Sequence, residues 1–221
     1  MIALSKLHFH YPRSDFSLEI QKLHFESGTK TALIGPSGFG KTTLLNLMAG
    51  ILLPDSGEIE VGGHHLKHLS EKERRNFRIR NIGFVFQDFR LIPYLNVLDN
   101  ILLPFRINRI LHLDNKSRKS AQQLATDLGL EDKLMKFPDK LSHGERQRVA
   151  ICRALVNKPP VILADEPTGN LDPQNKQKIM KILFNYVEEH LATLITVSHD
   201  LQILDGFNKT IDFADLQNYK S

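Results

Sequence analysis

The chain has 221 residues, of which 41% are hydrophobic and 24% are charged, a composition typical of a globular protein with one well-buried core. A formal net charge of +4 is too small to indicate nucleic-acid binding, and no apolar run approaches the roughly 18 residues that a membrane-spanning helix needs. The single cysteine excludes an intrachain disulfide, and the N-terminus lacks the apolar stretch of a signal peptide. We therefore expect a cytoplasmic protein.

The N-terminal part of the chain predicts strands followed by a loop and a helix. Residues 1–34 alternate apolar and polar side chains, as strands of a partly exposed antiparallel sheet do, and residues 30–34 (KTALI) predict a short buried strand. Residues 42–49 predict a helix that ends at Gly50. Between this strand and helix lies GPSGFGKT, residues 35–42, which matches the phosphate-binding pattern G-x-x-x-x-G-K-[ST].

The residue types in this loop suit phosphate chemistry. Glycines allow backbone N–H groups to curve around phosphate oxygens at a helix N-terminus, Lys41 supplies a positive charge, and Thr42 offers a hydroxyl to Mg²⁺. The alternative is a glycine-rich turn that contains Lys-Thr by chance, but the strand–loop–helix setting favours nucleotide binding. The predicted nucleotide contacts are Gly35, Pro36, Ser37, Gly38, Phe39, Gly40, Lys41, Thr42 and Thr43.

The rest of the chain alternates between strand and helix patterns. A turn at residues 54–57 precedes a strand at 58–61, and the apolar run NIGFVF at 81–86 is typical of a buried parallel strand. Helical patterns replace strands from about residue 88 to residue 158. The remaining predicted elements are helices at 97–107, 117–128, 144–157 and 174–189, with strands at 161–164 and 194–197. This order predicts an α/β nucleotide-binding core with a helical insertion.

The strand VILADEP, residues 161–167, ends in two adjacent acids. Beside a phosphate loop, Asp165 would hold Mg²⁺ and Glu166 would face an attacking water. Two neighbouring carboxylates repel each other, which favours a cation nearby. The alternative is an acidic strand-to-turn junction ended by Pro167.

LSHGERQRVAICRAL, residues 141–155, contains a capping box formed by Ser142 and Glu145. By itself it predicts only a well-capped helix. Here, however, the sequence resembles the ATP-binding cassette (ABC) family, whose signature is Leu-Ser-Gly-Gly-Gln/Glu. Several motifs follow the family's order: the phosphate loop at 35–42, Gln87 after a strand, the signature at 141–145, the acids at 161–166, then Asp172 and His199.

The resemblance implies a role for each matching residue. Gln87 would sense Mg²⁺ and the attacking water, Glu166 would orient or deprotonate that water, and His199 would contact the γ-phosphate. Asp172 would couple the two sites of a dimer, and Tyr11 would stack on adenine. Without this context His199 would be interpreted as a surface or packing residue. The implied catalytic residues are Lys41, Gln87, Glu166 and His199, and the implied Mg²⁺ ligands are Thr42, Gln87 and Asp165.

The resemblance also implies an architecture and partners. The fold would be a RecA-like P-loop core with an antiparallel β subdomain and an inserted α-helical subdomain, forming one domain with its core at 1–87 and 159–221 and the insertion at about 88–158. Two copies would pack head to tail so that each signature closes the other's ATP, and a membrane permease would dock at the cytoplasmic face of the membrane. The signature-side contacts would be Ser142, His143, Gly144, Glu145 and Asp172.

The chain departs from the family pattern at His143, which replaces a glycine and puts the phosphate contact there in doubt, and at Phe39 in the loop. Residues 84–104 and 165–172 resemble most the subgroup for lipoprotein release, macrolide-type export and cell division, which predicts an export ATPase without nucleic-acid partners. The apolar run at 91–95 predicts a docking patch or part of the insertion's own core. An importer ATPase, a non-transport cassette protein and a P-loop nucleotide kinase are the alternatives.

Overall fold

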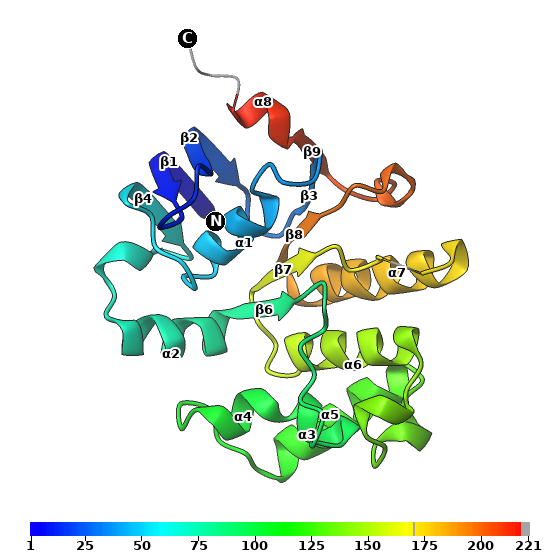
Figure 1. The fold of residues 1–221 in the computed structure, drawn as a ribbon. Coiled ribbons are helices and arrows are strands. Elements are labelled where there is room, and N and C mark those ends of the chain that lie inside the picture. Colours follow the sequence, from blue (N-terminus) through cyan, green and yellow to red (C-terminus); the bar gives the residue numbers. More distant parts are fainter. Residues whose placement is uncertain (170, 218–221) are drawn as a thin grey trace.

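The computed structural model describes residues 1–169 and 171–217 and contains two β-sheets (Figure 1). The first is antiparallel, with the order β2-β1-β4-β5, and the second is parallel, with the order β6-β7-β8-β3-β9. The antiparallel strands are β1 (Ile2–His10), β2 (Ser17–Phe25), β4 (Ser56–Val61) and β5 (His64–His65). The parallel strands are β3 (Lys30–Ile34), β6 (Ile82–Val85), β7 (Val161–Asp165), β8 (Thr193–Val197) and β9 (Lys209–Asp212).

Helix α1 (Lys41–Met48) lies between the two sheets, and it shares a hydrophobic core with them (Figure 1). The other face of the parallel sheet packs on a second core that contains α6 (His143–Leu155) and α7 (Pro173–His190). Strand β7 serves both cores because its side chains alternate: Leu163 belongs to the first core and Ile162 to the second. The parallel sheet therefore separates α1 from α6.

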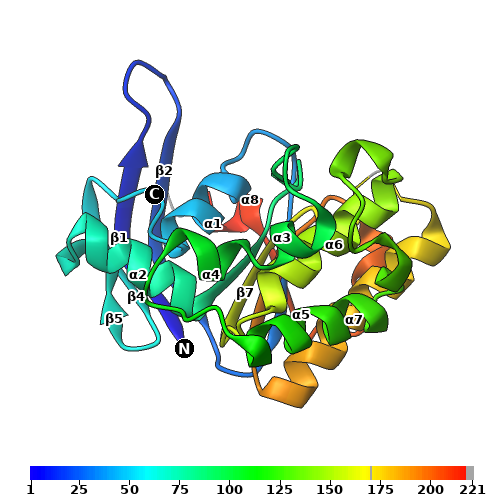
Figure 2. The ribbon, with the colours of Figure 1, turned by 90° about the horizontal axis from the view of Figure 1, so that it is seen from below.

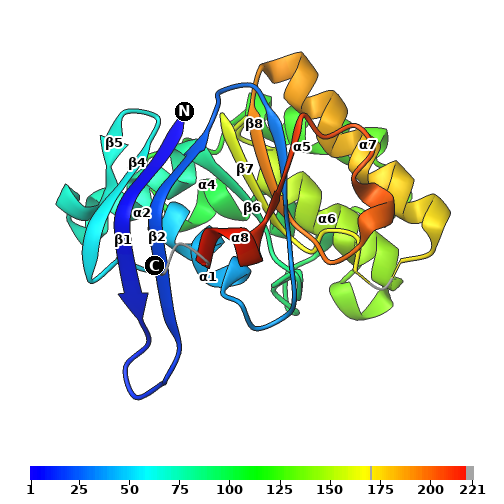
Figure 3. The same ribbon diagram turned by 90° about the horizontal axis from the view of Figure 1, so that it is seen from above.

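The inserted helices gather on the α6 side of the molecule, as the view from below shows (Figure 2). The view from above shows β1 and β2 side by side, with their connecting loop projecting at one end (Figure 3). The remaining helices are α2 (Glu71–Asn81), α3 (Val97–Ile101), α4 (Leu103–Ile107), α5 (Asn115–Asp127) and α8 (Phe213–Gln217). Short 3₁₀ turns lie at Leu66–His68, Glu131–Lys133, Pro138–Lys140 and Leu201–Ile203.

Three sequence predictions need correction. The helix expected at 97–107 divides at Leu102 into α3 and α4, because Pro104 has no N–H to continue the hydrogen-bond ladder. The apolar run at 81–86 is a strand only over Ile82–Val85, since Asn81 closes α2. Helix α2 itself, strand β9 and helix α8 were absent from the prediction.

Candidate active site

The phosphate-binding loop connects the carboxyl end of β3 to the N-terminus of α1, where the prediction placed it. Gly40 caps the helix in the left-handed region, at a φ of 96°. A Cβ at this position would lie 2.6 Å from the Cζ atom of Phe16, so that ring would have to shift, and the positive φ would strain any residue other than glycine. The first N–H groups of α1 have no partner within the helix, and together with the helix dipole they favour an anion at the loop.

Lys41 is 6% exposed and folds over the loop. Its Nζ atom donates hydrogen bonds to the carbonyl oxygens of Gly35 and Pro36, at 2.7 and 2.6 Å. Burial lowers the pKa of Lys41, while the carboxylates of Glu166, Asp165 and Asp212 oppose that shift. The ammonium is thus held where loop carbonyls and several carboxylates converge.

Asp165 is the last residue of β7 and is 4% exposed. The hydroxyl of Thr42 donates to its Oδ1 atom at 3.1 Å, which joins the start of α1 to the end of β7 across more than a hundred residues of sequence. Burial raises the pKa of Asp165, and the hydrogen bond from Thr42 partly offsets this. A hydroxyl and a carboxylate side by side form the hard oxygen donor set that Mg²⁺ prefers.

Glu166 and His199 face each other at the same edge of the sheet. The carboxylate Oε2 of Glu166 lies 2.9 Å from Nδ1 of His199, and the Glu166 backbone N–H donates to the carbonyl of Val197. Glu166 has a φ of 47°, an uncommon backbone angle for a residue with a side chain. The strained turn after β7 therefore directs an acid at the histidine that follows β8.

Gln87 is exposed in the turn that follows β6. Because β6 is the parallel neighbour of β7, this turn lies at the same sheet edge as Asp165. Its position agrees with the predicted role, although within the described residues the structure forms no hydrogen bond between Gln87 and the loop. The structure thus brings together Lys41, Thr42, Asp165, Glu166 and His199, and it leaves Gln87 beside them.

Tyr11 lies next to the start of α1. Its hydroxyl is 3.2 Å from the Oγ1 atom of Thr43, and its ring packs edge-on against Phe9 and at a tilt against Phe16. The aromatic face near the loop is therefore formed by two residues, Tyr11 and Phe16. Sequence reasoning identified Tyr11 and missed Phe16, whose contact with Gly40 depends on how the loop between β1 and β2 folds back.

The signature segment forms the predicted capping box at the N-terminus of α6. The backbone N–H of Ser142 donates to Glu145 Oε2 at 2.7 Å, and the Glu145 N–H donates back to Ser142 Oγ at 3.3 Å. This cap lies on the face of the parallel sheet opposite α1 (Figure 1). The segment is thus separated from the phosphate loop of its own chain.

His143 occupies the first helical position of α6. Its backbone is outside the left-handed region. Histidine can therefore replace the family's glycine here without backbone strain. The ring packs edge-on against Phe89 at 4.8 Å, and its Nδ1 atom is buried without a hydrogen-bond partner. His143 therefore connects the signature to the turn that follows Gln87. Phe39, the other departure, is 37% exposed at the loop.

Asp172 is the N-cap of α7, where its Oδ1 atom accepts the N–H of Asn175 at 3.1 Å. The hydrogen bonds from Asn175 lower the pKa of Asp172. Asn170, two residues before Asp172 in the sequence, lies outside the described residues. Within one chain, then, Asp172 has a structural role as a helix cap.

Arg153 is a buried residue that sequence reasoning missed. It donates to the backbone carbonyls of Phe89 and Arg90, both of which have positive φ angles, and burial lowers its pKa to about 10. An arginine on the buried side of a helix was the available signal, because such a residue needs internal acceptors. Arg153 thereby fixes the turn between Gln87 and the insertion.

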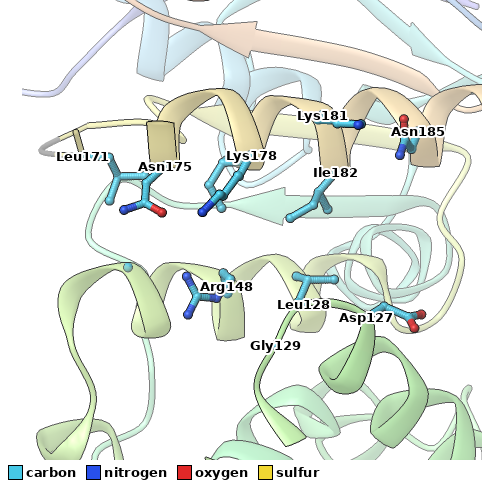
Figure 4. A pocket seen from close by; sticks show the side chains of 12 residues that line it. Asp127, Leu128, Gly129, Arg148, Leu171, Asn175, Lys178, Lys181, Ile182 and Asn185 are labelled. Atoms are coloured by element: carbon cyan, nitrogen blue, oxygen red, sulfur yellow. The ribbon is translucent and has the colours of Figure 1, made fainter. Parts of the chain in front are cut away.

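A pocket of about 440 Å³ opens between α6 and α7 and reaches Gly144 of the signature (Figure 4). Figure 4 shows Arg148 on the α6 side of this pocket, with Lys178 and Ile182 on the α7 side. Gly144 is the one predicted nucleotide contact among its lining residues, and none of the phosphate-loop residues 35–43 lines it. The cluster around Lys41 and Asp165 remains the candidate catalytic centre.

Comparison with known proteins decides the family. Residues 18–169 match the sequence model described as ABC transporter. The chain belongs to the ABC transporter family. This confirms the resemblance inferred from the ordered motifs, and with it the assignment of an ATP-binding ATPase.

Named relatives of this ABC ATPase include the lipoprotein-releasing system ATP-binding protein LolD 1 of Rhodopirellula baltica. The two are 39% identical over 97% of this chain and 94% of the relative. The macrolide export ATP-binding/permease protein MacB of the same organism is 40% identical over 97% of this chain but only 32% of its own length. An uncharacterised ABC transporter ATP-binding protein, YbbA of Escherichia coli, is 45% identical over 82% of the chain and 79% of its own length.

The ABC fold is also confirmed by a solved structure. The ATP-binding cassette MJ0796, described as a dimer in a post-hydrolysis state bound to ADP and Pi, has a TM-score of 0.87 and 34% sequence identity. The match covers 96% of this chain and 94% of that one. Over the described residues of our chain, we find no helix with the length and apolar character to span a membrane.

Proposed function

We propose that this ABC ATPase is the motor of a membrane export complex, in which two copies close on two ATP molecules and drive a separate permease. The observation that carries the proposal is the site geometry: Thr42 with Asp165, and Glu166 with His199, meet at the phosphate loop, whereas the signature lies on the other face of the sheet. The relatives named for lipoprotein release and macrolide export support the direction of transport.

In the proposed hydrolysis of ATP, each site residue has a separate role. The ammonium of Lys41 exchanges its two loop carbonyls for β- and γ-phosphate oxygens. Glu166 accepts a hydrogen bond or a proton from the attacking water, and His199, 2.9 Å away, holds that carboxylate and reaches toward the γ-phosphate. Tyr11 offers its ring to adenine, and Gln87 faces the same edge of the sheet.

The donors present fit Mg²⁺. Thr42 and Asp165 would hold it, with Gln87 at the adjacent turn, and the ion would neutralise charge on the β- and γ-phosphates. Ionised Asp165 is costly in its buried position without a cation, which is the property of this structure that fits a metal here.

The second copy supplies the missing side of each site. In this arrangement the signature residues 142–145 of one chain cover the phosphate loop of the other. Asp172 lies near the interface between the two copies. A self-complementary pair of this kind forms with two-fold symmetry, and a nucleotide bound between the halves stabilises it. Loss of the γ-phosphate removes contacts and favours separation.

The proposal also divides the chain into an ATPase core and a helical subdomain. We assign the ATPase core to residues 1–87 and 159–221 and the helical subdomain to about 88–158, within a single domain. The side chains of α3, α5 and α6 share one hydrophobic core with β6 and β7, which supports one cooperative unit rather than two. Residues 170 and 218–221 of this range lie outside the described residues.

A permease would dock at the cytoplasmic face of the membrane on the groove between α2, β6 and α4. The groove has a volume of about 300 Å³, and Ile79, Phe84, Phe86 and Ile107 contribute its apolar surface. Ile107 is 63% exposed, and Tyr94, in the 91–95 run that follows the groove residue Arg90 in the chain, is 79% exposed. Leu91 in contrast packs against the insertion's core, which supports the core interpretation for that residue, and we assign docking to Tyr94.

Substitution of Tyr94 tests the docking proposal. Tyr94→Glu should leave the melting temperature and basal ATPase of the isolated chain unchanged, because the side chain is largely in solvent. Co-purification with the permease subunit should be lost, since a carboxylate would enter an apolar contact. Leu191→Glu, 81% exposed at the end of α7, is the matched control.

Retention of the membrane protein by the Tyr94→Glu chain, at the level of the control, would overturn the docking assignment. A large fall in melting temperature of the isolated chain would contradict it as well, because Tyr94 would then belong to the folded core.

A further inference from the structure

The outer face of the antiparallel sheet carries a group of histidines and acids that the ATPase reaction does not use. Among the described residues, His8, His10 and Asp55 have ligand-type atoms that all lie within 4.8 Å of one another. The Nδ1 atoms of His10 and His8 are 2.7 and 3.6 Å from Asp55 Oδ2. We propose that these three residues form a site for a divalent transition-metal ion such as Zn²⁺, separate from the Mg²⁺ at the phosphate loop.

The sequence places these side chains together by elementary strand geometry. His8 and His10 are two residues apart on β1, so both point to the same face of the sheet. Asp55 directly precedes β4, which runs antiparallel to β1 and pairs Ser56 with His8. A register shift between Ser5 and His8, where Lys6 adopts a φ of 48°, resets the alternation so that both histidines face outward.

The backbone fixes Asp55 relative to the histidines. Its N–H donates to the His8 carbonyl at 2.9 Å, and its Oδ2 atom accepts the backbone N–H of His10 at 2.8 Å. The carboxylate therefore keeps its place when the imidazole rings move. Such preorganisation is what separates a ligand set from a chance cluster of surface side chains.

Glu19 adds a second carboxylate behind His8. It pairs with His8 across β1 and β2, and its Oε1 atom lies 3.9 Å from His8 Nε2. Nδ1 of His8 lies on the Asp55 side of the ring and Nε2 on the Glu19 side, at 3.6 and 3.9 Å, so with Nδ1 on a metal the Glu19 carboxylate would be the group that orients the ring through Nε2. The two acids also give the site a negative charge that attracts a cation.

The donor types select the metal. Two imidazole nitrogens and one carboxylate suit Zn²⁺, Co²⁺, Ni²⁺ or Cu²⁺, whereas Mg²⁺ prefers oxygen alone. The side chains of His8, His10 and Asp55 are 42, 54 and 41% exposed, so water can complete the coordination. The site lies one residue before Tyr11, at the base of the loop that reaches the phosphate-binding loop.

Zn²⁺ binding to the full-length chain, prepared without a histidine tag, tests the proposal. Titration calorimetry in excess Mg²⁺ and without nucleotide should give one Zn²⁺ per chain and a rise in melting temperature. Cys152 is buried and does not compete for the ion. His10→Ala should weaken binding by more than about 10-fold, and Glu19→Gln by about 10-fold through the orientation of His8.

The matched control is the second histidine group of the same sheet, in which His65 and His68 lie 3.8 and 3.9 Å from Glu58. His65→Ala combined with His68→Ala should leave Zn²⁺ affinity unchanged. His10→Ala keeps the backbone N–H that holds Asp55 and loses only an exposed contact of the imidazole with that carboxylate, so its melting temperature without metal should fall only slightly. The proposal is overturned if the wild-type chain binds no stoichiometric Zn²⁺, or if the control loses binding while His10→Ala retains it.

Discussion

At the scale of single residues, the site depends on a carboxylate that the fold buries at a cost. Asp165 is 4% exposed, and burial raises its pKa, because the charged form loses its hydration. Thr42 supplies only one hydrogen bond in compensation. The buried carboxylate of Asp165 therefore lowers the stability of the fold at a position that the proposed chemistry needs.

Asp165→Asn should therefore raise the free energy of unfolding at neutral pH while lowering Mg²⁺-dependent ATP hydrolysis. A carboxyl group whose pKa is raised by folding stabilises the fold fully below its ordinary value of 3.8, and this contribution is lost as the pH rises through the raised pKa. The asparagine carries no charge and can still accept the Thr42 hydroxyl, so the variant avoids that loss. Urea unfolding at several pH values, without nucleotide, measures the difference.

The advantage of Asp165→Asn over the wild type should shrink as the pH falls. Asp139→Asn, at a carboxylate that is largely in solvent, serves as the control and should leave stability unchanged. A wild-type chain as stable as Asp165→Asn at neutral pH would contradict the buried-charge account.

Site residues that belong to a sequence motif could be predicted. Site residues defined by a contact between distant segments could not. Lys41, Thr42, Asp165, Glu166 and His199 each follow a recognisable pattern, and the structure brings them together. The contacts of His143 with Phe89 and of Arg153 with the carbonyls after Gln87 join segments that lie more than fifty residues apart. No local pattern specifies such pairs, because they depend on how the insertion packs against the core.

At the scale of elements, acidic caps define four helix starts. The N-termini of α2, α5, α6 and α7 each hold an acid that accepts hydrogen bonds within the first turn, and these bonds lower the pKa of that acid. The largest contribution comes from the Ser70 hydroxyl for the acid of α2 and from a backbone N–H for the other three. The four acids are Glu73, Asp114, Glu145 and Asp172. Each carboxylate also complements the positive end of a helix dipole.

The caps predict a loss of stability in acid. A lowered pKa means that the stabilisation is complete above the ordinary values, 4.5 for Glu73 and 3.8 for Asp172, and is lost as the pH falls through the lowered values. The free energy of unfolding should therefore decline from about pH 4.5 downward. Urea titrations between pH 6 and pH 3 measure this decline.

The variant Glu73→Gln with Glu145→Gln should decline less steeply, because glutamine does not titrate. Glu26→Gln with Glu189→Gln, at exposed positions outside the caps, should follow the wild type. Identical slopes for the cap variant and the wild type would refute the contribution of these caps.

The elements missed from sequence lacked the usual periodicity. In α2 only Phe77 is buried, so the segment has a polar, charged pattern with no apolar stripe, and the Ser70–Glu73 capping box was its one signal. Strand β9 is a half-exposed edge strand of four residues. The split at Leu102 was readable from Pro104, but helical periodicity on both sides concealed it.

At the scale of the whole molecule, the parallel sheet separates the phosphate loop from the signature, the two segments proposed to enclose the nucleotide. The phosphate loop and α1 lie on one face, and the signature and α6 lie on the other (Figure 1). A single chain therefore positions the residues proposed to bind and hydrolyse ATP but cannot close its own site with its own signature. The resemblance to the ABC family implied this division, whereas the packing of α1 between two sheets required the structure.

The most direct test of this shared-site account is size-exclusion chromatography of Glu166→Gln with ATP. The substitution should retain ATP binding and lower hydrolysis by roughly 10²–10⁴-fold, the usual contribution of a general base. Unhydrolysed ATP should then hold two chains together, whereas ADP should leave monomers. Adding Gly144→Glu, where a Cβ meets no atom closer than 3.7 Å, should abolish the dimer but preserve ATP binding. A Glu166→Gln chain that remains monomeric with ATP and hydrolyses it at the wild-type rate would contradict both the role of Glu166 and the shared site.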